Sequence, residues 1–202
     1  MQTISTIEEL DAIYGEPGER SILKEVPALT KGYRAFVEAS PFVVMATSGA
    51  GGLDCSPKGD APCFVRILDD RTLAIPDRPG NNRTDNLRNI LEDPRISLLF
   101  LIPGVREMLR INGRAAITVD DELRASFAVN GKLPRSVILV TTEAVYFHCA
   151  KAVMRSRLWD IDAQIDPSQL PTGGDILTEI TNGKIDGDAY DRELPERLKS
   201  TL

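Results

Sequence analysis

The sequence predicts a mainly β (α+β) fold, in which a mostly antiparallel barrel is surrounded by peripheral helices. Two observations predict this class. About six segments have the length and apolar content of strands, and they outnumber the helical patterns between them. The regular alternation of strand and helix that a doubly wound parallel sheet requires is missing from the sequence. A sheet of antiparallel neighbours is therefore the simplest arrangement of these segments.

Length, charge and composition limit the possible functions. The chain has 202 residues, of which 42% are hydrophobic, and this suits one well-packed domain. Its formal net charge of −6, without a local basic patch, argues against a nucleic-acid partner. No apolar run reaches the length of a membrane span, and the N-terminus lacks signal-peptide character. Three irregularly spaced cysteines favour a reducing compartment, so we expect a cytoplasmic protein without a membrane partner.

Helical patterns predict a cover at the N-terminal side of the barrel. The segment from Thr6 to Glu9 has the form of a capping box, and apolar residues follow it at helical spacing. A second helical pattern covers residues 21–39 and is interrupted at Pro27. We expect a single domain in three parts, which are a helical cover at 1–39, the barrel at 40–150 and a C-terminal segment with short helices at 151–202.

The barrel strands are predicted from apolar runs and from alternation. Residues 41–47 and 95–102 are continuous apolar runs, which suit strands that are buried on both faces. Residues 62–68 and 72–76 are expected to form a hairpin, whereas residues 55–60 are expected to form a polar turn. The remaining expected strands are 105–119 and 136–149, and the expected central helices are 84–93 and 120–129.

The segment 77–83 is the strongest candidate for a ligand site. It joins a strand to the start of a helix, where unpaired backbone N–H groups and the helix dipole attract an anion. Arg78 and Arg83 bracket this point, and guanidinium groups suit phosphate oxygens. Asn81 and Asn82 add amide donors and tolerate unusual backbone angles. The segment either binds the phosphate of a cofactor or is an ordinary exposed loop.

Polar residues inside apolar strands mark further candidates. Arg66 lies in the middle of the strand 62–68, where it needs a carboxylate, an anion or solvent. Alternation in the strand 105–119 puts one row of residues on the same side, namely Arg106, Met108, Arg110 and Asn112. This row is either a solvated edge or one wall of a polar ligand site. His148 is the only histidine, and its apolar strand favours a core or interface role over a catalytic one.

Three stretches of the chain resemble one known family. They read SPFVVMATSG, SPKGDAPCFVRILDDRTLAIPDRPGNNRTDNLRNILEDPRISLLF and REMLRINGRA. In this order they are similar to the pyridoxamine 5′-phosphate oxidase-like flavoproteins, above all to an FMN-dependent branch of mostly unassigned substrate. The resemblance covers residues 41–159. It implies a six-stranded antiparallel split β-barrel of the FMN-binding type, a homodimer, and one FMN in each of two grooves at the subunit interface.

The resemblance also implies which residues contact FMN. Arg78, Asn81, Asn82 and Arg83 match the loop that binds the FMN phosphate in the family. Arg66 matches a strand position where the family has a basic residue near the flavin. The other implied contacts are Lys58 near the isoalloxazine edge, Met108, Arg110 and Asn112 on the strand that flanks the cofactor, and Lys151 and Arg155 in a segment that often reaches the cofactor from the second subunit.

The predicted function is FMN-dependent oxidation or reduction of an undetermined small molecule. Flavin chemistry needs oriented donors and positive charge around the ring, and a chain with one histidine offers no nucleophile–base pair or metal-site pattern. The segment RSRLWDID does not reproduce the Trp, Arg and His pattern with which true vitamin B6 oxidases hold their substrate. The alternatives are a non-catalytic flavin or haem binder on the same barrel and a flavin-free structural domain.

Overall fold

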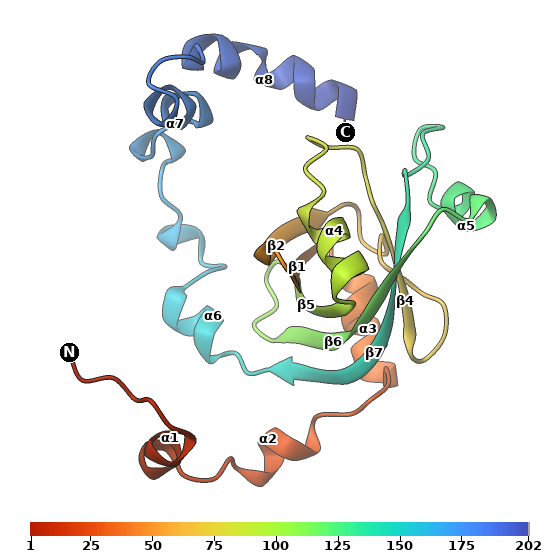
Figure 1. Ribbon diagram of the computed structural model, residues 1–202, viewed down its shortest axis with the longest axis vertical. Coiled ribbons are helices and arrows are strands. Elements are labelled where there is room, and N and C mark those ends of the chain that lie inside the picture. The colour runs from red at the N-terminus through yellow and green to blue at the C-terminus, as the bar shows by residue number, and fades with distance from the viewer. Residues whose placement is uncertain (202) are drawn as a thin grey trace. The chain divides into compact units, whose positions relative to one another are not determined.

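The computed structural model describes residues 1–201, which fold into two compact units (Figure 1). The sheet unit consists of Met1–Asp77 and Thr84–Lys151. The C-terminal unit consists of Arg78–Arg83 and the chain that follows from Ala152. All strands of the described residues belong to the sheet unit, whereas the C-terminal unit is built from helices and loops.

The sheet unit contains one antiparallel sheet of seven strands, in agreement with the expected α+β class. Its strand order is β2-β1-β5-β6-β7-β4-β3. The strands are β1 (Phe42–Gly49), β2 (Gly52–Gly59), β3 (Arg66–Ile67), β4 (Thr72–Pro76), β5 (Arg95–Leu101), β6 (Met108–Thr118) and β7 (Val137–His148).

The expected count of six strands was wrong, because residues 55–60 do not form a turn. Residues 55–59 belong to β2, which forms a hairpin with β1 and pairs with it residue by residue. The polar side chains of β2 hid it from pattern analysis, yet a strand at a sheet edge needs hydrogen bonds from only one neighbour. The expected strand 62–68 is reduced to β3, since Cys63 has a φ of +68°, which is incompatible with extended backbone.

The sheet curls strongly, but backbone hydrogen bonds do not close it. Among the described residues, β2 and β3 stand at opposite ends of the strand order and do not pair with each other. Lys58 on β2 nevertheless forms an ion pair with Asp77, directly after β4, with 3.3 Å between Nζ and Oδ1. In a flat sheet the five spacings from β2 to β4 would separate these strands by about 24 Å. The expected barrel is thus replaced by a curled, open sheet.

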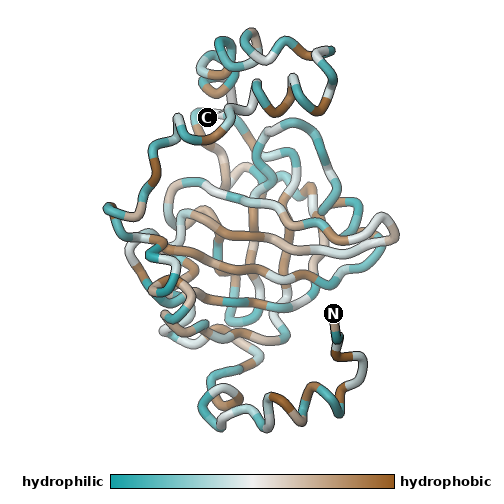
Figure 2. Tube along the Cα trace, turned by 90° about the vertical axis from the view of Figure 1, so that its left-hand side faces the viewer, coloured by the Kyte–Doolittle hydropathy of each residue, from teal (hydrophilic) through white to brown (hydrophobic). Residues whose placement is uncertain are grey.

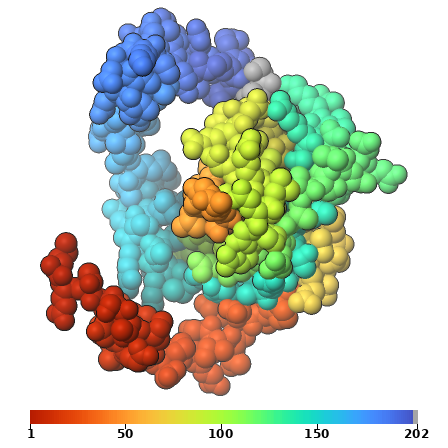
Figure 3. Space-filling model, in the orientation of Figure 1, coloured from red at the N-terminus to blue at the C-terminus, as the bar shows by residue number. Residues whose placement is uncertain are grey.

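The hydrophobic core fills the concave face of the curled sheet. Figure 2 shows hydrophobic residues concentrated along the strands. Two helices complete the core, with Val37 from α3 (Lys31–Ala39) and Ile90 from α4 (Asp85–Glu92). Figure 3 shows α4, in yellow-green, beside the orange β1–β2 hairpin. The fully buried strand residues include Val43, Met45, Leu98, Phe100, Leu109 and Ile111.

The other helices of the sheet unit lie close to their predicted positions. The predicted helix after Asp120 is α5 (Asp121–Ser126), and the Asp120 carboxylate accepts a hydrogen bond from its backbone at 2.8 Å. Thr6 caps α1 (Ile7–Tyr14) as predicted, since its hydroxyl accepts from the backbone N–H of Glu9, but the Glu9 carboxylate accepts from the backbone N–H of Ser5. The region around Pro27 separates α2 (Glu19–Leu23) from α3. Every residue from 1 to 23 is exposed, so α1 and α2 bury no apolar side chain.

A helix pair organises the C-terminal unit. α7 (Gly173–Ile180) and α8 (Gly187–Thr201) approach closely at Gly174 and Gly187, where a Cβ on either glycine would lie 2.2 Å from the carbonyl oxygen of the other. α6 (Lys151–Ser156) and two short 3-10 helices (Ile161–Ala163 and Pro167–Gln169) precede this pair. Neither these helices nor the others in the described chain combine the length and apolar character needed to cross a membrane.

A β-bulge interrupts the longest strand pair of the sheet. β6 and β7 are paired along their length, but the register shifts between Asn112 and Gly113. Glu143 is the extra residue of β7 at this point. A Cβ on Gly113 would lie 2.1 Å from the carbonyl oxygen of Thr141, so only glycine fits here without displacement of the backbone.

We expect Gly113→Ala to destabilise the sheet unit. Since the clash is with backbone on a paired strand, relief requires movement of β7, and the free energy of unfolding should fall by about 1–3 kcal/mol. Gly51→Ala is the control, because a Cβ at Gly51 would meet no atom within 4 Å. Urea denaturation of the three proteins measures the effect, and equal stability of Gly113→Ala and Gly51→Ala would contradict the assignment of the bulge.

Candidate functional site

Three predicted cofactor residues form a row on the outer face of β6. Met108, Arg110 and Asn112 are half-buried, whereas the intervening Leu109 and Ile111 are fully buried in the core. Directly opposite on β7 stand His148, Tyr146 and Ala144. Residues directly opposite one another share a face of the sheet. We call these six residues the β6–β7 strip, since they form one continuous outer surface.

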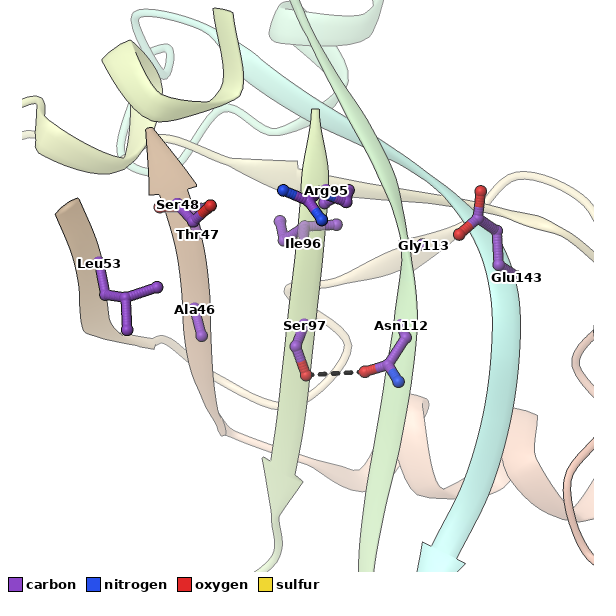
Figure 4. A pocket seen from close by; sticks show the side chains of 10 residues that line it. All are labelled: Ala46, Thr47, Ser48, Leu53, Arg95, Ile96, Ser97, Asn112, Gly113 and Glu143. Atoms are coloured by element: carbon purple, nitrogen blue, oxygen red, sulfur yellow. Dashed lines mark hydrogen bonds between the residues drawn. The ribbon is translucent and has the colours of Figure 1, made fainter. Parts of the chain in front are cut away.

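An open hollow of about 370 Å³ lies at the Asn112 end of the strip (Figure 4). The hydroxyl of Ser97 donates a hydrogen bond to the side-chain oxygen of Asn112 at 2.8 Å, and this fixes the amide at the wall of the hollow. The bulge residue Glu143 lies at the opposite side from β1. The hollow is lined by Ala46, Thr47, Ser48, Leu53, Arg95, Ile96, Ser97, Asn112, Gly113 and Glu143.

The lining of this hollow is mostly apolar with several polar groups, and it carries little excess positive charge. Arg95 is already paired, because its Nε donates to both carboxylate oxygens of Asp93 at 3.0 and 2.9 Å. These hydrogen bonds, rather than burial, lower the pKa of Asp93 to about 2. Glu143 adds an exposed carboxylate. Such a lining suits the carbonyl and N–H groups of a polar ring better than a free phosphate.

Positive charge gathers at the other end of the strip. A terminal nitrogen of Arg110 donates to the hydroxyl of Tyr146 at 2.9 Å, and the guanidinium carbon lies 5.7 Å from the centre of that ring. Lys24 Nζ lies 5.6 Å from the same ring centre and donates to the carbonyl oxygen of Phe147 at 2.7 Å. Within the described residues, neither Arg110 nor Lys24 forms an ion pair with a carboxylate.

His148 lies beside these two cations. Its ring centre is 5.3 Å from that of Tyr146, and its Nε2 is buried without a hydrogen-bond partner in the described part of the chain. Burial, followed by the charges of Arg110 and Lys24, lowers the pKa of the imidazole below its usual 6.5. His148 is therefore neutral at pH 7 and belongs to the outer strip rather than to the hydrophobic core.

The structure places Lys58 and Arg66 on other strands and gives each a partner. Lys58 is half-buried on β2 in its ion pair with Asp77. Arg66 on β3 donates a hydrogen bond to the carbonyl oxygen of Ser126, and its guanidinium carbon lies 4.3 Å from the ring centre of Phe127. Because β7 and β4 stand between β6 and β3, Arg66 is not brought next to the row on β6.

The predicted phosphate loop belongs to the C-terminal unit, and the helix that follows it in sequence belongs to the sheet unit. Within the loop, the backbone N–H of Arg83 donates to the side chain of Asn81 at 2.9 Å, and Asn82 has a φ of +60°. The positive φ of Asn82 agrees with the expectation that the asparagines of this loop tolerate unusual backbone angles. α4 begins after Thr84, whose side chain makes no capping hydrogen bond.

Lys151 and Arg155 both lie on α6, and both are exposed.

Tyr146 in the strip and Lys24 beside its positive end were not recognised as candidates from the sequence. Tyr146 alternates with His148 on β7, so its position on the same face could have been inferred from the spacing. Lys24 carried no such signal, because a β-bridge between Val26 and Val145 brings it to β7 across most of the chain.

Comparison with known proteins identifies a family. Residues 29–149 match the family described as pyridoxamine 5′-phosphate oxidase. No curated protein sequence matches the chain. Among solved structures, HupZ of Group A Streptococcus is 19% identical with a TM-score of 0.47, and the alignment covers 58% of this chain and 91% of that one. A proposed pyridoxamine 5′-phosphate oxidase of Lactobacillus delbrueckii is 20% identical, with coverages of 60% and 95% and a TM-score of 0.47. An F420 reductase is 16% identical, with coverages of 59% and 98% and a TM-score of 0.41.

Side chains that bind metals do not cluster in the described residues. No group of three or more histidine, cysteine, aspartate or glutamate side chains among them is arranged to hold a metal ion. The charges that lower the pKa of His148 are those of Arg110 and Lys24.

We expect His148 to make stability depend on pH just below its usual pKa of 6.5. Below pH 6.5 the imidazole of His148 takes up a proton in the unfolded chain, whereas the folded state disfavours the charged imidazole. The free energy of unfolding therefore falls as the pH drops from 6.5 through the lowered pKa of His148. His148→Gln should remove this slope. Urea denaturation between about pH 8 and pH 5 measures it, above the range where carboxylates titrate. Parallel curves for the two proteins would show that the imidazole is not disfavoured in its charged form.

Proposed function

The chain belongs to the pyridoxamine 5′-phosphate oxidase family, and from this premise we propose that it is an FMN-dependent oxidoreductase acting on a small molecule. The observation that carries the proposal is the family match over residues 29–149, because this range contains all seven strands and the segment 77–83. The cofactor, the substrate class and the dimer discussed below are parts of the same proposal.

The loop 78–83 supports the binding of the FMN phosphate. It offers the guanidinium groups of Arg78 and Arg83 and the amides of Asn81 and Asn82 within six residues. Guanidinium groups match phosphate oxygens in geometry as well as in charge. The left-handed backbone at Asn82 gives the loop the kind of tight turn in which N–H groups converge on an anion. We assign the phosphate to these four residues.

The β6–β7 strip supports the binding of the flavin ring. Met108 provides an apolar contact, and Asn112 provides an amide beside the hollow. Arg110 provides positive charge, which stabilises a reduced flavin when it lies near N1 and O2 of the ring. Bound FMN would supply hydride chemistry at its ring, while these side chains would orient the ring and limit access of water.

A homodimer in which two copies contact each FMN fits the positions of the remaining residues. Arg66 on β3 and the row on β6 lie three strand spacings apart, which is about 14 Å. The outer face also carries apolar side chains beside the strip, such as Phe42 with 38% exposure and the half-buried Leu99. A second copy that covers this face would bury them and contribute its own residues to the cofactor. Lys58, Lys151 and Arg155 are further proposed contacts.

We propose a substrate other than pyridoxamine 5′-phosphate. True vitamin B6 oxidases are expected to hold pyridoxamine 5′-phosphate with a pattern of Trp, Arg and His. The segment RSRLWDID at residues 155–162 does not reproduce this pattern. In its place the chain has an ion pair between Arg157 and Asp160, with 3.0 Å between Nε and Oδ2. An arginine engaged in this way is less available to a phosphorylated ligand.

The proposal predicts that the full-length protein binds FMN and shows flavin absorbance that bleaches with a hydride donor. Arg83→Ala removes one charge-assisted contact, so the affinity for FMN should fall about ten- to a hundredfold. Arg71→Ala is the matched control, because Arg71 is an exposed arginine between β3 and β4. Titration by quenching of FMN fluorescence measures both variants.

Three other results of this experiment would change the conclusion. Equal affinities of Arg83→Ala and Arg71→Ala would contradict the phosphate assignment. Absence of FMN binding by the wild-type protein would overturn the proposed function. A haem-type spectrum in the purified protein would favour the alternative of a haem-binding protein on this fold.

A further inference from the structure

Four side chains at the positive end of the β6–β7 strip form a cluster of hydrogen-bond donors. We call Lys24, Arg110, Tyr146 and His148 the donor cluster; all four are half-buried. The hydroxyl of Tyr146 accepts its hydrogen bond from Arg110, which leaves its own hydrogen available to donate. Arg110 and Lys24 each use only part of their donor capacity. The cluster is therefore rich in donors.

No acceptor of matching charge faces these donors within the described residues. Arg110 and Lys24 form no ion pair there. The charges that affect His148 are these two cations and no carboxylate. The ring of Tyr146 attracts each cation, but two like charges gathered at one half-buried site repel each other unless an anion offsets them. An anion would therefore complete the cluster.

His148 supplies an independent observation in the same place. Its Nε2 is buried and unpaired, although buried polar atoms are normally hydrogen-bonded. A neutral imidazole that carries its hydrogen on Nε2 is a donor, and an oxygen of a bound anion would be its acceptor. The same anion would lie within reach of Arg110, since both side chains contact the ring of Tyr146. One ligand would thus satisfy the orphaned atom and both cations.

We propose that the donor cluster binds an anionic oxygen group, either a carboxylate or a phosphate, carried by the small-molecule substrate. This inference rests on the proposed function, because Arg110 belongs to the row assigned to the flavin. It adds that the substrate is an acid whose anionic group anchors it at the end of β6 and β7. Lys24 lies outside residues 29–149, so this anchor includes a residue beyond the part of the chain that matches the family.

The experiment follows the imidazole of His148 by NMR in the full-length protein. The chain has only one histidine, so its resonances are unambiguous. Inorganic phosphate and acetate are titrated separately at constant ionic strength, with sodium chloride as the reference. Phosphate or acetate should shift the His148 resonances in a saturable way, and the pKa of His148 should rise because a bound anion stabilises the imidazolium. The anion that binds more tightly identifies the group.

Four variants locate the binding to the cluster. Arg110→Gln and Lys24→Gln should each weaken binding of the anion about tenfold or more, and Tyr146→Phe, which removes a neutral donor, should weaken it less. Arg71→Ala is the control, because Arg71 is an exposed arginine outside the cluster and outside the proposed cofactor contacts, and it should leave the response of His148 unchanged. Flavin absorbance in the same samples shows whether an added anion displaces FMN.

Several results would overturn the inference. One is a response of His148 to phosphate and acetate that is no larger than its response to chloride. Another is wild-type anion affinity in both Arg110→Gln and Lys24→Gln. A His148 pKa that depends on protein concentration but not on added anion would assign the cluster to a carboxylate of a second copy. A protein that binds FMN but no anion loses only this inference. One that binds anions but no FMN keeps the anion site, but it loses the proposed function and with it the assignment of the anion to a substrate.

Discussion

The pairing of β6 with β7 is the interaction on which the rest of the structure depends. These are the two longest strands, and they lie next to each other in the sheet. Their register buries Leu109 and Ile111 in the core and brings Arg110 opposite Tyr146 on the outer face. A shift by one residue would exchange the two sets of side chains between core and surface. The apolar core thus holds the polar strip in place, since neither face can change without the other.

The two ends of the strip differ in their electrostatics, and the bulge lies at one of them. At Asn112 the extra residue Glu143 and the pair of Arg95 with Asp93 keep the hollow nearly balanced in charge. Toward the end of the strands, Arg110 has no carboxylate partner among the described residues. In the proposals made above, the flavin ring takes the first environment and the anionic group of the substrate takes the second.

The curl of the sheet explains why predicted residues from distant strands differ in accessibility. Lys58 lies on the first strand of the order and forms an ion pair with Asp77 after β4, so the two ends of the sheet approach each other around the core. Arg66 faces α5 and stacks on Phe127. A carboxylate, an anion or solvent had been expected for Arg66; the side chain is exposed to solvent, and the contact with Phe127 is an additional guanidinium–aromatic interaction.

The sequence by itself determined the antiparallel α+β class, most strand and helix positions, and the row of Met108, Arg110 and Asn112, because apolar periodicity reports which face of an element is buried. The tertiary structure decided what periodicity does not encode. The polar β2 forms through hydrogen bonds to β1, the curl follows from the packing of the core, and Lys24 reaches β7 through the bridge of Val26 with Val145. Each of these depends on contacts between segments, whereas periodicity reports on one segment at a time. The backbone groups that pair β2 with β1 and Val26 with Val145 are present in nearly every residue, so the order of side chains does not reveal these pairings.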